Sequence, residues 1–364
     1  QQMVIKNIEI GLVYIPLIKV FKTALRSADS FDMIVVKITT QSGIVGYGET
    51  APSKAVTGNT KESIIKTLNF LKPMLIGKNI EDFNTLINFV HNSIKLNFSA
   101  KSAIEIALYD IVSQNAKLPL FQYLGGVKKD FKSNMTISLN KKETMVKDTI
   151  EAMQNGFKSL KIKLGDDYKE DILRIGEINN IINDNISLKI DANQGWNPKD
   201  SVKFLNAIEG KNIVIDFLEQ PVNRFDIKGL KYIKERTSIP IVADESMFSP
   251  QDCIEILESQ SADMINIKLD KCGGISKAMQ IADICAMYDV KCMIGCMMQG
   301  AISVGAAAHV ASAKSDSIVI YDLDSPMHCK ISPVIGGVKF NAPNVTLLKV
   351  DGLGIKSIEG VVWL

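Results

Sequence analysis

The chain is poor in histidine, nearly neutral in charge and free of long apolar runs. Its 364 residues include only three histidines, His91, His309 and His328, so we expect neither a histidine-based metal site nor a catalytic triad. A net charge of +2 gives no reason to expect nucleic acid or a membrane as a partner. No apolar run reaches the roughly 18 residues of a membrane-spanning helix. The first residues also lack the apolar core of a signal peptide, so we expect a cytoplasmic protein.

Cysteine is absent from the first two thirds of the chain, and the six cysteines that follow have no framework spacing. A chain of this length can bury a sizeable core without disulfides. We therefore interpret the cysteines as reduced core thiols. They are Cys253, Cys272, Cys285, Cys292, Cys296 and Cys329.

The first third of the chain changes from a strand pattern to a helix pattern. Residues 3–50 alternate apolar and polar side chains, which predicts a meander of antiparallel strands. No helix follows Gly43, Gly46 and Gly48, so we interpret them as hairpin-turn residues and not as a nucleotide-binding loop. Residues 60–124 carry apolar side chains at helical spacing. We therefore expect an α+β capping domain over residues 1–126.

From residue 133 onward the sequence alternates between strand and helix patterns. Asn197 and Ser249 each stand before a proline, an arrangement typical of a helix start. We expect an α/β domain over residues 127–330, a TIM-type (β/α)8 barrel in its modified (β/α)7β form, with residues 331–364 packing back on the capping domain. The eight candidate strands are 133–140, 159–165, 187–193, 213–221, 239–246, 262–270, 290–297 and 317–324.

Five of these strands end in a charged residue. The five are Lys163, Asp191, Glu219, Asp244 and Lys268, at intervals of 28, 28, 25 and 24 residues, which fits one strand, one loop and one helix each. We expect a buried strand to end in a charged residue only where that charge has a function. In such barrels the carboxyl ends of the strands carry the active site. Strands two and six lie opposite each other in a ring of eight, so we expect the two lysines to face each other beside three carboxylates.

The chemistry of this set favours proton transfer at a carbon next to a carboxylate. Three carboxylates without histidine or cysteine form an oxygen site that suits Mg²⁺. A substrate carboxylate bound there has a more acidic α-proton, because the metal stabilises the enediolate that forms. One lysine can remove this proton and the other can return one on the opposite face, which gives the epimer. Side chains alternate along a strand, so Lys161 shares a face with Lys163, and Asn193 shares one with Asp191.

Several stretches carry a family resemblance when read in order. The motifs KIK, DAN, LEQP, ADES and NIKLDKCGG, together with GYGETAP near the start, resemble the enolase superfamily and within it the muconate-lactonising subgroup. The resemblance covers nearly the whole chain. It implies one Mg²⁺ held by Asp191, Glu219 and Asp244, with Lys163 and Lys268 as acid and base. It also implies that Lys161 helps to hold the substrate carboxylate and that the protein is a homo-oligomer. Because Asn193 shares a strand face with Asp191, we expect it to contact the substrate as well.

The resemblance extends to one kind of substrate. Asp322 and Asp324 resemble the DxD pair of dipeptide epimerases, which binds the free α-ammonium of a dipeptide. The loop at 15–30 is similar to the specificity loop of L-Ala-D/L-Glu epimerases, which act on a piece of bacterial cell-wall peptide. By this likeness Arg26 pairs with the carboxylate of a C-terminal glutamate, although Val20 stands where that loop has proline. Thr136 and Cys296 are then expected to line the dipeptide pocket, with a second loop at 51–60.

Other interpretations stay open at this point. The same metal site serves cycloisomerases, o-succinylbenzoate synthases and N-acylamino acid racemases, none of which binds a free ammonium. A metal-binding sensor without turnover is a third hypothesis, although it has no need for two opposed bases. Asp322 and Asp324 could form a turn before Ser325–Pro326, and Arg26 could be a solvated loop charge.

Overall fold

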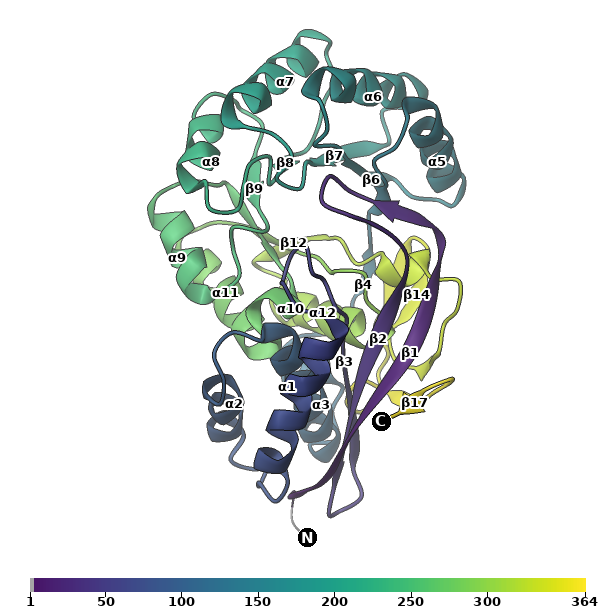
Figure 1. Ribbon diagram of the computed structural model, residues 1–364, viewed down its shortest axis with the longest axis vertical. Coiled ribbons are helices and arrows are strands. Elements are labelled where there is room, and N and C mark those ends of the chain that lie inside the picture. The colour runs from purple at the N-terminus through teal and green to yellow at the C-terminus, as the bar shows by residue number, and fades with distance from the viewer. Residues whose placement is uncertain (1–2) are drawn as a thin grey trace.

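The computed structural model describes residues 3–364, so the first two residues of the predicted capping domain lie outside the described residues. An antiparallel sheet with helices forms one part of the molecule, and a parallel sheet ringed by helices forms the other (Figure 1). Both parts carry the predicted strand types, so the predicted fold class is confirmed. None of the helices in residues 3–364 combines the length and the apolar character that a membrane crossing requires.

The capping sheet has the strand order β17–β1–β2–β3, with two long strands in the middle. Strand β2 is central, and Met33, Ile34, Val35 and Val36 in it are all fully buried, which explains its continuous apolar run. All its pairings are antiparallel, as the alternation predicts. The strands are β1 (Ile5–Lys22), β2 (Ser27–Thr40), β3 (Val45–Thr50) and β17 (Val362–Trp363).

Strands β1 and β2 extend beyond the capping sheet as a hairpin. The segment expected as a loop at 15–30 is mostly strand, because β1 runs to Lys22 and β2 begins at Ser27. A shift of register between Pro16 and Phe21 interrupts the pairing, and Thr23 N donates to Arg26 O (2.9 Å) at the tip. In Figure 1 this tip lies near β6 (Ser159–Lys163) of the parallel sheet, so the hairpin brings Arg26 to the barrel.

The helices of the capping part cover one face of its sheet. They are α1 (Lys61–Leu75), α2 (Phe83–Asn92), α3 (Phe98–Asn115) and the short α4 (Leu120–Tyr123). Helix α3 is buried along almost its whole length and packs closely on β3. A Cβ added at Gly48 would lie 1.7 Å from Ala103 O. The interpretation of all three early glycines as turn residues is therefore wrong for Gly46 and Gly48, which lie inside β3 at this contact, while Gly43 does adopt a turn conformation (φ +89°).

Eight parallel strands follow one another around the barrel in chain order. All eight match predicted segments, although the fourth is much shorter than its predicted range of 213–221. The two edges of the sheet meet where Asn134 N donates to Tyr321 O (3.2 Å). The strands are β5 (Met135–Ile137), β6 (Ser159–Lys163), β7 (Ser187–Asp191), β8 (Leu218–Glu219), β9 (Ile241–Ala243), β10 (Met264–Ile267), β11 (Cys292–Ile294) and β12 (Ile318–Tyr321).

Helices surround the barrel on its outside (Figure 1). After β12 the described chain forms only the 3₁₀ turn η1 (Ser325–His328) in place of an α-helix, which gives the modified (β/α)7β form. Asn197 and Ser249 cap α7 and α9 as predicted, each accepting a backbone N–H three residues on. The helices are α5 (Lys142–Gln154), α6 (Tyr168–Ile181), α7 (Pro198–Gly210), α8 (Ile227–Lys234), α9 (Pro250–Glu258), α10 (Leu269–Cys272), α11 (Ile275–Met287) and α12 (Ala301–Ala313).

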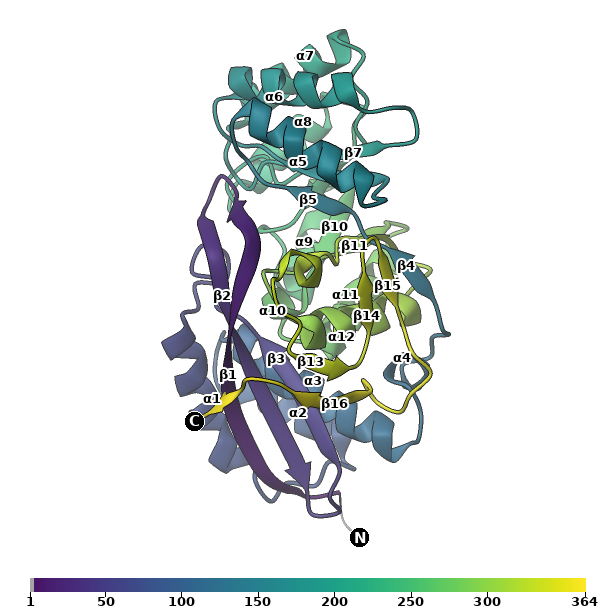
Figure 2. The same cartoon turned by 90° about the vertical axis from the view of Figure 1, so that its right-hand side faces the viewer.

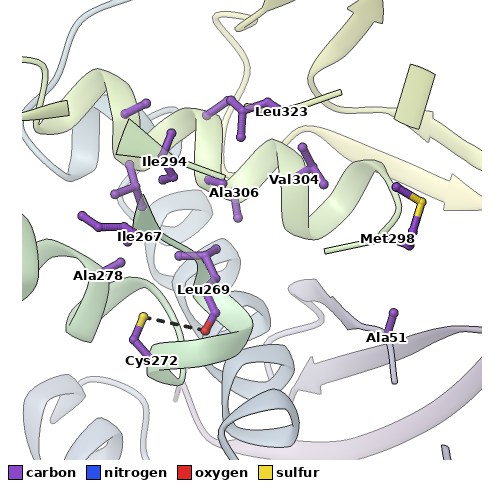
Figure 3. Close-up of a cluster of buried hydrophobic side chains, with 14 of the residues drawn as sticks. Ala51, Ile267, Leu269, Cys272, Ala278, Ile294, Met298, Val304, Ala306 and Leu323 are labelled. Carbon is purple, nitrogen blue, oxygen red and sulfur yellow. Dashed lines mark hydrogen bonds between the residues drawn. The ribbon is translucent and has the colours of Figure 1, made fainter. Parts of the chain in front are cut away.

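One apolar core runs through both parts of the molecule. In Figure 3, Ile267 and Ile294 at the ends of barrel strands lie beside Ala306 of α12. Ala51, just after β3, belongs to the same cluster as Leu323, just after β12. The capping part and the barrel therefore pack as one unit, which holds the hairpin in a fixed place.

The end of the chain returns to the first strand. Strand β17 pairs with β1, and Gly11 stands opposite Trp363. Figure 2 shows this final segment crossing the capping sheet after two small sheets beside the barrel. Those sheets contain β4 (Asp130–Lys132), β13 (Val334–Gly336), β14 (Lys339–Asn341), β15 (Asn344–Thr346) and β16 (Ile355–Ile358).

Candidate active site

Three fully buried carboxylates meet at the carboxyl ends of adjacent strands. Asp191 ends β7, Glu219 ends β8 and Asp244 follows β9, and one oxygen of each lies within 4.8 Å of the others. Burial together with the nearby charge of Asp191 raises the pKa of Glu219 well above its usual value. Glu219 Oε1 has no hydrogen-bond partner among the described residues. Like charges and an unpartnered buried oxygen are costly without a cation, so the donor set fits a hard divalent metal ion.

The two strand-end lysines line the same cavity from different walls. Lys163 Nζ lies 2.7 Å from Asp191 Oδ2 and 3.0 Å from Asn193 Oδ1. Lys268 Nζ lies 2.7 Å from Asp244 Oδ2. Burial is the largest effect and disfavours the charge on Lys268, but Asp244, Glu219 and Glu245 together outweigh it and raise the pKa of Lys268 above its usual value. β6 and β10 stand four positions apart in the ring of eight, so the lysines approach the cavity from opposite sides.

Lys161 lies deeper in the barrel, among the carboxylates. Its Nζ lies 3.5 Å from Glu219 Oε2 and 3.7 Å from Asp191 Oδ2, and it donates a short hydrogen bond to Asp322. Burial opposes the charged form, but Asp322 and these two neighbours raise the pKa of Lys161 well above its usual value. Lys161 is therefore a buried ammonium held by carboxylates.

The aspartate pair after β12 faces the cavity and does not form a solvent-exposed turn. Asp322 and Asp324 are each only 3 % exposed, and both line the cavity. Asp322 also accepts from Asn134 Nδ2 (2.7 Å), and Lys161 holds its pKa down at about 2 against the effect of burial. Asp324 Oδ2 accepts from Thr136 N (2.7 Å). Buried carboxylates at this depth supply negative charge for a cationic ligand group.

The hairpin brings one further cation to the cavity. Arg26 lines it together with Phe21, and the guanidinium carbon lies 5.9 Å from the centre of that ring. Burial lowers the pKa of Arg26, and no carboxylate among the described residues forms an ion pair with it. Thr136 and Cys296 line the same cavity. Burial raises the pKa of the Cys296 thiol well above its usual value, so this cysteine is a neutral wall residue.

The structure also brings in two charged residues that the sequence analysis left out. Lys271 lies in the short helix α10, which places its Nζ 2.7 Å from Asp244 Oδ1. Glu245 accepts from Asn193 Nδ2 (2.8 Å), and burial beside Asp244 raises its pKa to about 7. Both lie close in the sequence to a predicted site residue. Lys271 comes three positions after Lys268, and Glu245 directly follows Asp244. A wider search around each motif could have found them.

Comparisons with known proteins agree with this geometry. The chain is 43% identical over 358 residues to the L-Ala-D/L-Glu epimerase of Clostridium acetobutylicum, covering 98% of this chain and 100% of that one. It superposes with a TM-score of 0.96 on the substrate-liganded L-Ala-D/L-Glu epimerase of Bacillus subtilis, at 39% identity and covering 98% and 99% of the two chains. It superposes with a TM-score of 0.93 on the Enterococcus faecalis dipeptide epimerase complexed with Mg and L-Leu-L-Tyr, at 38% identity and covering 97% and 100%.

Two family models cover most of the sequence. Residues 9–125 match the N-terminal domain of mandelate racemase and muconate lactonizing enzyme, and residues 144–360 match the enolase C-terminal domain-like family. The first match falls on the antiparallel sheet and its helices, and the second on the barrel that carries the acidic cluster. The chain belongs to the mandelate racemase and muconate lactonizing enzyme family of the enolase superfamily.

Proposed function

We propose that this chain is a Mg²⁺-dependent dipeptide epimerase that inverts the α-carbon of the C-terminal residue, converting L-Ala-L-Glu to L-Ala-D-Glu. The observation that carries the proposal is the pair of lysines on opposite strands, beside three carboxylates and in one cavity with a buried aspartate pair. The epimerase names of full-length relatives at 39–43% identity support the same reaction class. The enzyme is therefore an isomerase.

Asp191, Glu219 and Asp244 are the proposed metal ligands. Their donor set contains only oxygen, and Glu219 Oε1 lacks a partner among the described residues, which suits Mg²⁺. When bound, Mg²⁺ would make the α-proton of a coordinated substrate carboxylate more acidic and stabilise the negative charge that develops. The relative from Enterococcus faecalis was solved with Mg and a dipeptide, in keeping with this assignment.

Lys163 and Lys268 are the proposed acid and base. Each ends in an amine at the cavity, and each comes from a strand on the opposite side of the ring. One amine takes the α-proton from one face of the carbon, and the other delivers a proton to the opposite face. Lys161 is already positively charged and fully enclosed, so its role is to hold the substrate carboxylate.

The two ends of the cavity define the proposed substrate. Arg26 supplies a positive charge that no described carboxylate pairs with, which suits the side chain of a C-terminal glutamate. Asp322 and Asp324 supply negative charge for the α-ammonium of the first residue. Thr136, Asn193 and Cys296 line the space between them. The distribution of charge therefore matches a dipeptide with a free amine and an acidic C-terminal residue.

A second candidate substrate is a dipeptide with an apolar C-terminal residue. Phe21, Leu25 and Val56 line the cavity around Arg26, and the structural relative from Enterococcus faecalis carries L-Leu-L-Tyr. N-acylamino acid racemases, cycloisomerases and o-succinylbenzoate synthases fit less well, because their substrates give the aspartate pair no ammonium to bind.

The proposed setting follows from the substrate. L-Ala-D-Glu is a piece of bacterial cell-wall peptide, so we place the enzyme in the metabolism of such peptides in the cytoplasm, as a homo-oligomer.

The proposal is tested by polarimetry of L-Ala-L-Glu with purified enzyme, with Mg²⁺ and then with excess chelator. We expect rotation to change only with the metal, and Lys163→Ala and Lys268→Ala each to abolish the change while keeping the wild-type circular dichroism spectrum. Lys19→Ala, which removes an exposed lysine outside the cavity, is the control and keeps full activity. Turnover by both active-site variants would refute the two-base mechanism.

A further inference from the structure

The two aspartates of the cavity are held in different ways. Both oxygens of Asp322 are engaged, one by Asn134 and the other by Lys161. Both donors to Asp324 meet at a single oxygen, Oδ2, which accepts from Thr136 N at 2.7 Å and from His328 Nε2 at 2.9 Å. Asp324 Oδ1 accepts no hydrogen bond from any described residue. Of the two aspartates, Asp324 is thus the one with an oxygen free to accept a new donor.

His328 stands behind Asp324, away from the catalytic cavity. It is the last residue of η1, four positions after Asp324, and it lines a separate cavity with Met327 and Phe21. Its ring meets the ring of Phe21 edge-on, with centroids 6.1 Å apart and planes at 72°. Just beyond it, Lys330 N donates to Pro16 O (2.9 Å). His328 therefore connects the aspartate to the hairpin that carries Arg26.

We propose that His328 is a positioning residue for the ammonium site, because its hydrogen bond to Asp324 Oδ2 turns Oδ1 toward the cavity. The inference rests on the proposed function, since it assigns the α-ammonium of the substrate to Asp324 Oδ1. A carboxylate held only by Thr136 N could rotate about its Cβ–Cγ bond. An ammonium group would then have to order the carboxylate on binding, which weakens affinity. His328 thus determines how strongly the enzyme prefers a ligand with a free α-ammonium to a ligand without one.

The test compares two ligands that differ only in the ammonium group. We would measure KM and kcat for L-Ala-L-Glu, and the competitive inhibition constant of propanoyl-L-Glu, which lacks the amine. His328→Phe keeps a ring against Phe21 but removes the donor. We expect KM for the dipeptide to rise about tenfold, as for the loss of one hydrogen bond to a charged group, with kcat and the inhibition constant changed by less than about twofold.

Two further variants separate positioning from packing. His328→Gln can still donate an N–H to Asp324 and is expected to bring KM back to within about threefold of wild type. Met327→Leu changes the neighbouring residue of η1, which lines the same separate cavity, and leaves both ligands unaffected. His328→Leu provides the same comparison if the phenylalanine variant does not fold.

Two results would overturn the inference. An equal change for the dipeptide and for propanoyl-L-Glu would show a general structural role, and an unchanged KM in an active His328→Phe enzyme would show no role. Inactivity of the wild-type enzyme toward dipeptides is a different result, because it would refute the proposed function itself and the inference with it.

Discussion

At the scale of single residues, Lys271 shows how much of the site depends on buried polar contacts. Its ammonium has no exposed surface and donates to Asp244 Oδ1 (2.7 Å), Asp244 O (2.8 Å) and Asn266 O (2.9 Å). Because Asp244 also meets Lys268, the two lysines fix this carboxylate from both sides. Lys271 therefore orients Asp244 without reaching the cavity itself.

Removing this charge should destabilise the protein strongly. We expect Lys271→Met to lower the free energy of unfolding by about 3 kcal/mol, because it leaves two backbone carbonyls and a buried carboxylate oxygen without their donor. Urea denaturation measures the change. Lys19→Met is the control, since Lys19 bridges Asp148 and Glu151 at the surface and should cost less than about 1 kcal/mol. Equal effects from both variants would contradict the assigned role of burial.

Arg26 gives a prediction about substrate choice. We expect Arg26→Met to lower kcat/KM for L-Ala-L-Glu by about 100-fold, because the glutamate side chain loses a charge-assisted contact worth about 2–3 kcal/mol. L-Ala-L-Met, with a side chain of similar length and no charge, should lose less than about threefold. Steady-state kinetics with both dipeptides measure the two values. A parallel loss for both would show that Arg26 supports the hairpin and does not select the substrate.

The pattern of strands alone predicts the residues that lie at strand ends. Strand alternation and regular spacing bring Lys163, Asp191 and Lys268 to one rim, and the geometry has them there. Lys271 and His328 act through a short helical turn and a 3₁₀ turn. Such turns have no periodic signal in the sequence, so their contacts appear only when the chain is folded.

At the scale of elements, the contact between β3 and α3 shows why two glycines stand inside a strand. A Cβ at Gly48 would lie 1.7 Å from Ala103 O, and one at Gly46 would lie 2.3 Å from Ala107 O. The helix backbone thus packs directly on the strand backbone. The sequence predicted both elements but not their contact, because an isolated glycine pattern also fits a turn.

Gly48→Ala should therefore disrupt the capping part. We expect a loss of at least about 3 kcal/mol in the free energy of unfolding, because helix and strand must separate to admit one methyl group. Gly176→Ala is the matched control, since a Cβ there, within α6, meets no heavy atom within 4 Å. That change should be neutral or stabilise the protein by up to about 1 kcal/mol. Thermal unfolding of the two variants tests this contact. An unchanged stability of the Gly48→Ala protein would refute it.

The hairpin of β1 and β2 marks the limit of prediction for elements. The likeness to a specificity loop led us to expect a loop at 15–30, but pairing resumes at Phe21 with Ala28 after a shift of register. A strand that depends on its partner for order carries a weak local signal. For this reason the sequence predicted that Arg26 contacts the substrate, but it did not predict the β-hairpin that carries Arg26.

At the scale of the whole molecule, Glu49 joins the capping part to the barrel. This residue of β3 accepts backbone N–H groups from Gly300, Ile302 and Ser303 at the start of α12. Burial raises its pKa to about 7, although these hydrogen bonds favour the charged form. The junction between the two parts therefore contains a titratable group that is shielded from solvent.

The raised pKa gives stability a pH dependence of known sign. The folded protein holds the proton of Glu49 more tightly than the unfolded chain does, so this stabilisation is complete below the usual pKa of about 4.5. It is lost as the pH rises through about 7. Glu49→Gln cannot titrate, so the stability difference between wild type and variant should shift in favour of the variant from pH 5 to pH 8. Urea unfolding at both pH values measures it.

Glu143→Gln, an exposed residue in the first turn of α5, is the control for Glu49→Gln. Its difference from wild type should stay constant over the same range. A constant difference for Glu49→Gln as well would contradict the raised pKa at the junction.

The central claim is that two opposed lysines remove and return a proton at the α-carbon of the substrate. It is tested most directly by ¹H NMR of L-Ala-L-Glu with enzyme and Mg²⁺ in D₂O. We predict that the glutamate α-proton signal disappears while signals of L-Ala-D-Glu appear, since a proton removed on one face is replaced by deuterium on the other. Loss of the signal without the new epimer would contradict a second base. A signal that persists with L-Ala-L-Glu and with a library of other dipeptides would contradict the proposed function.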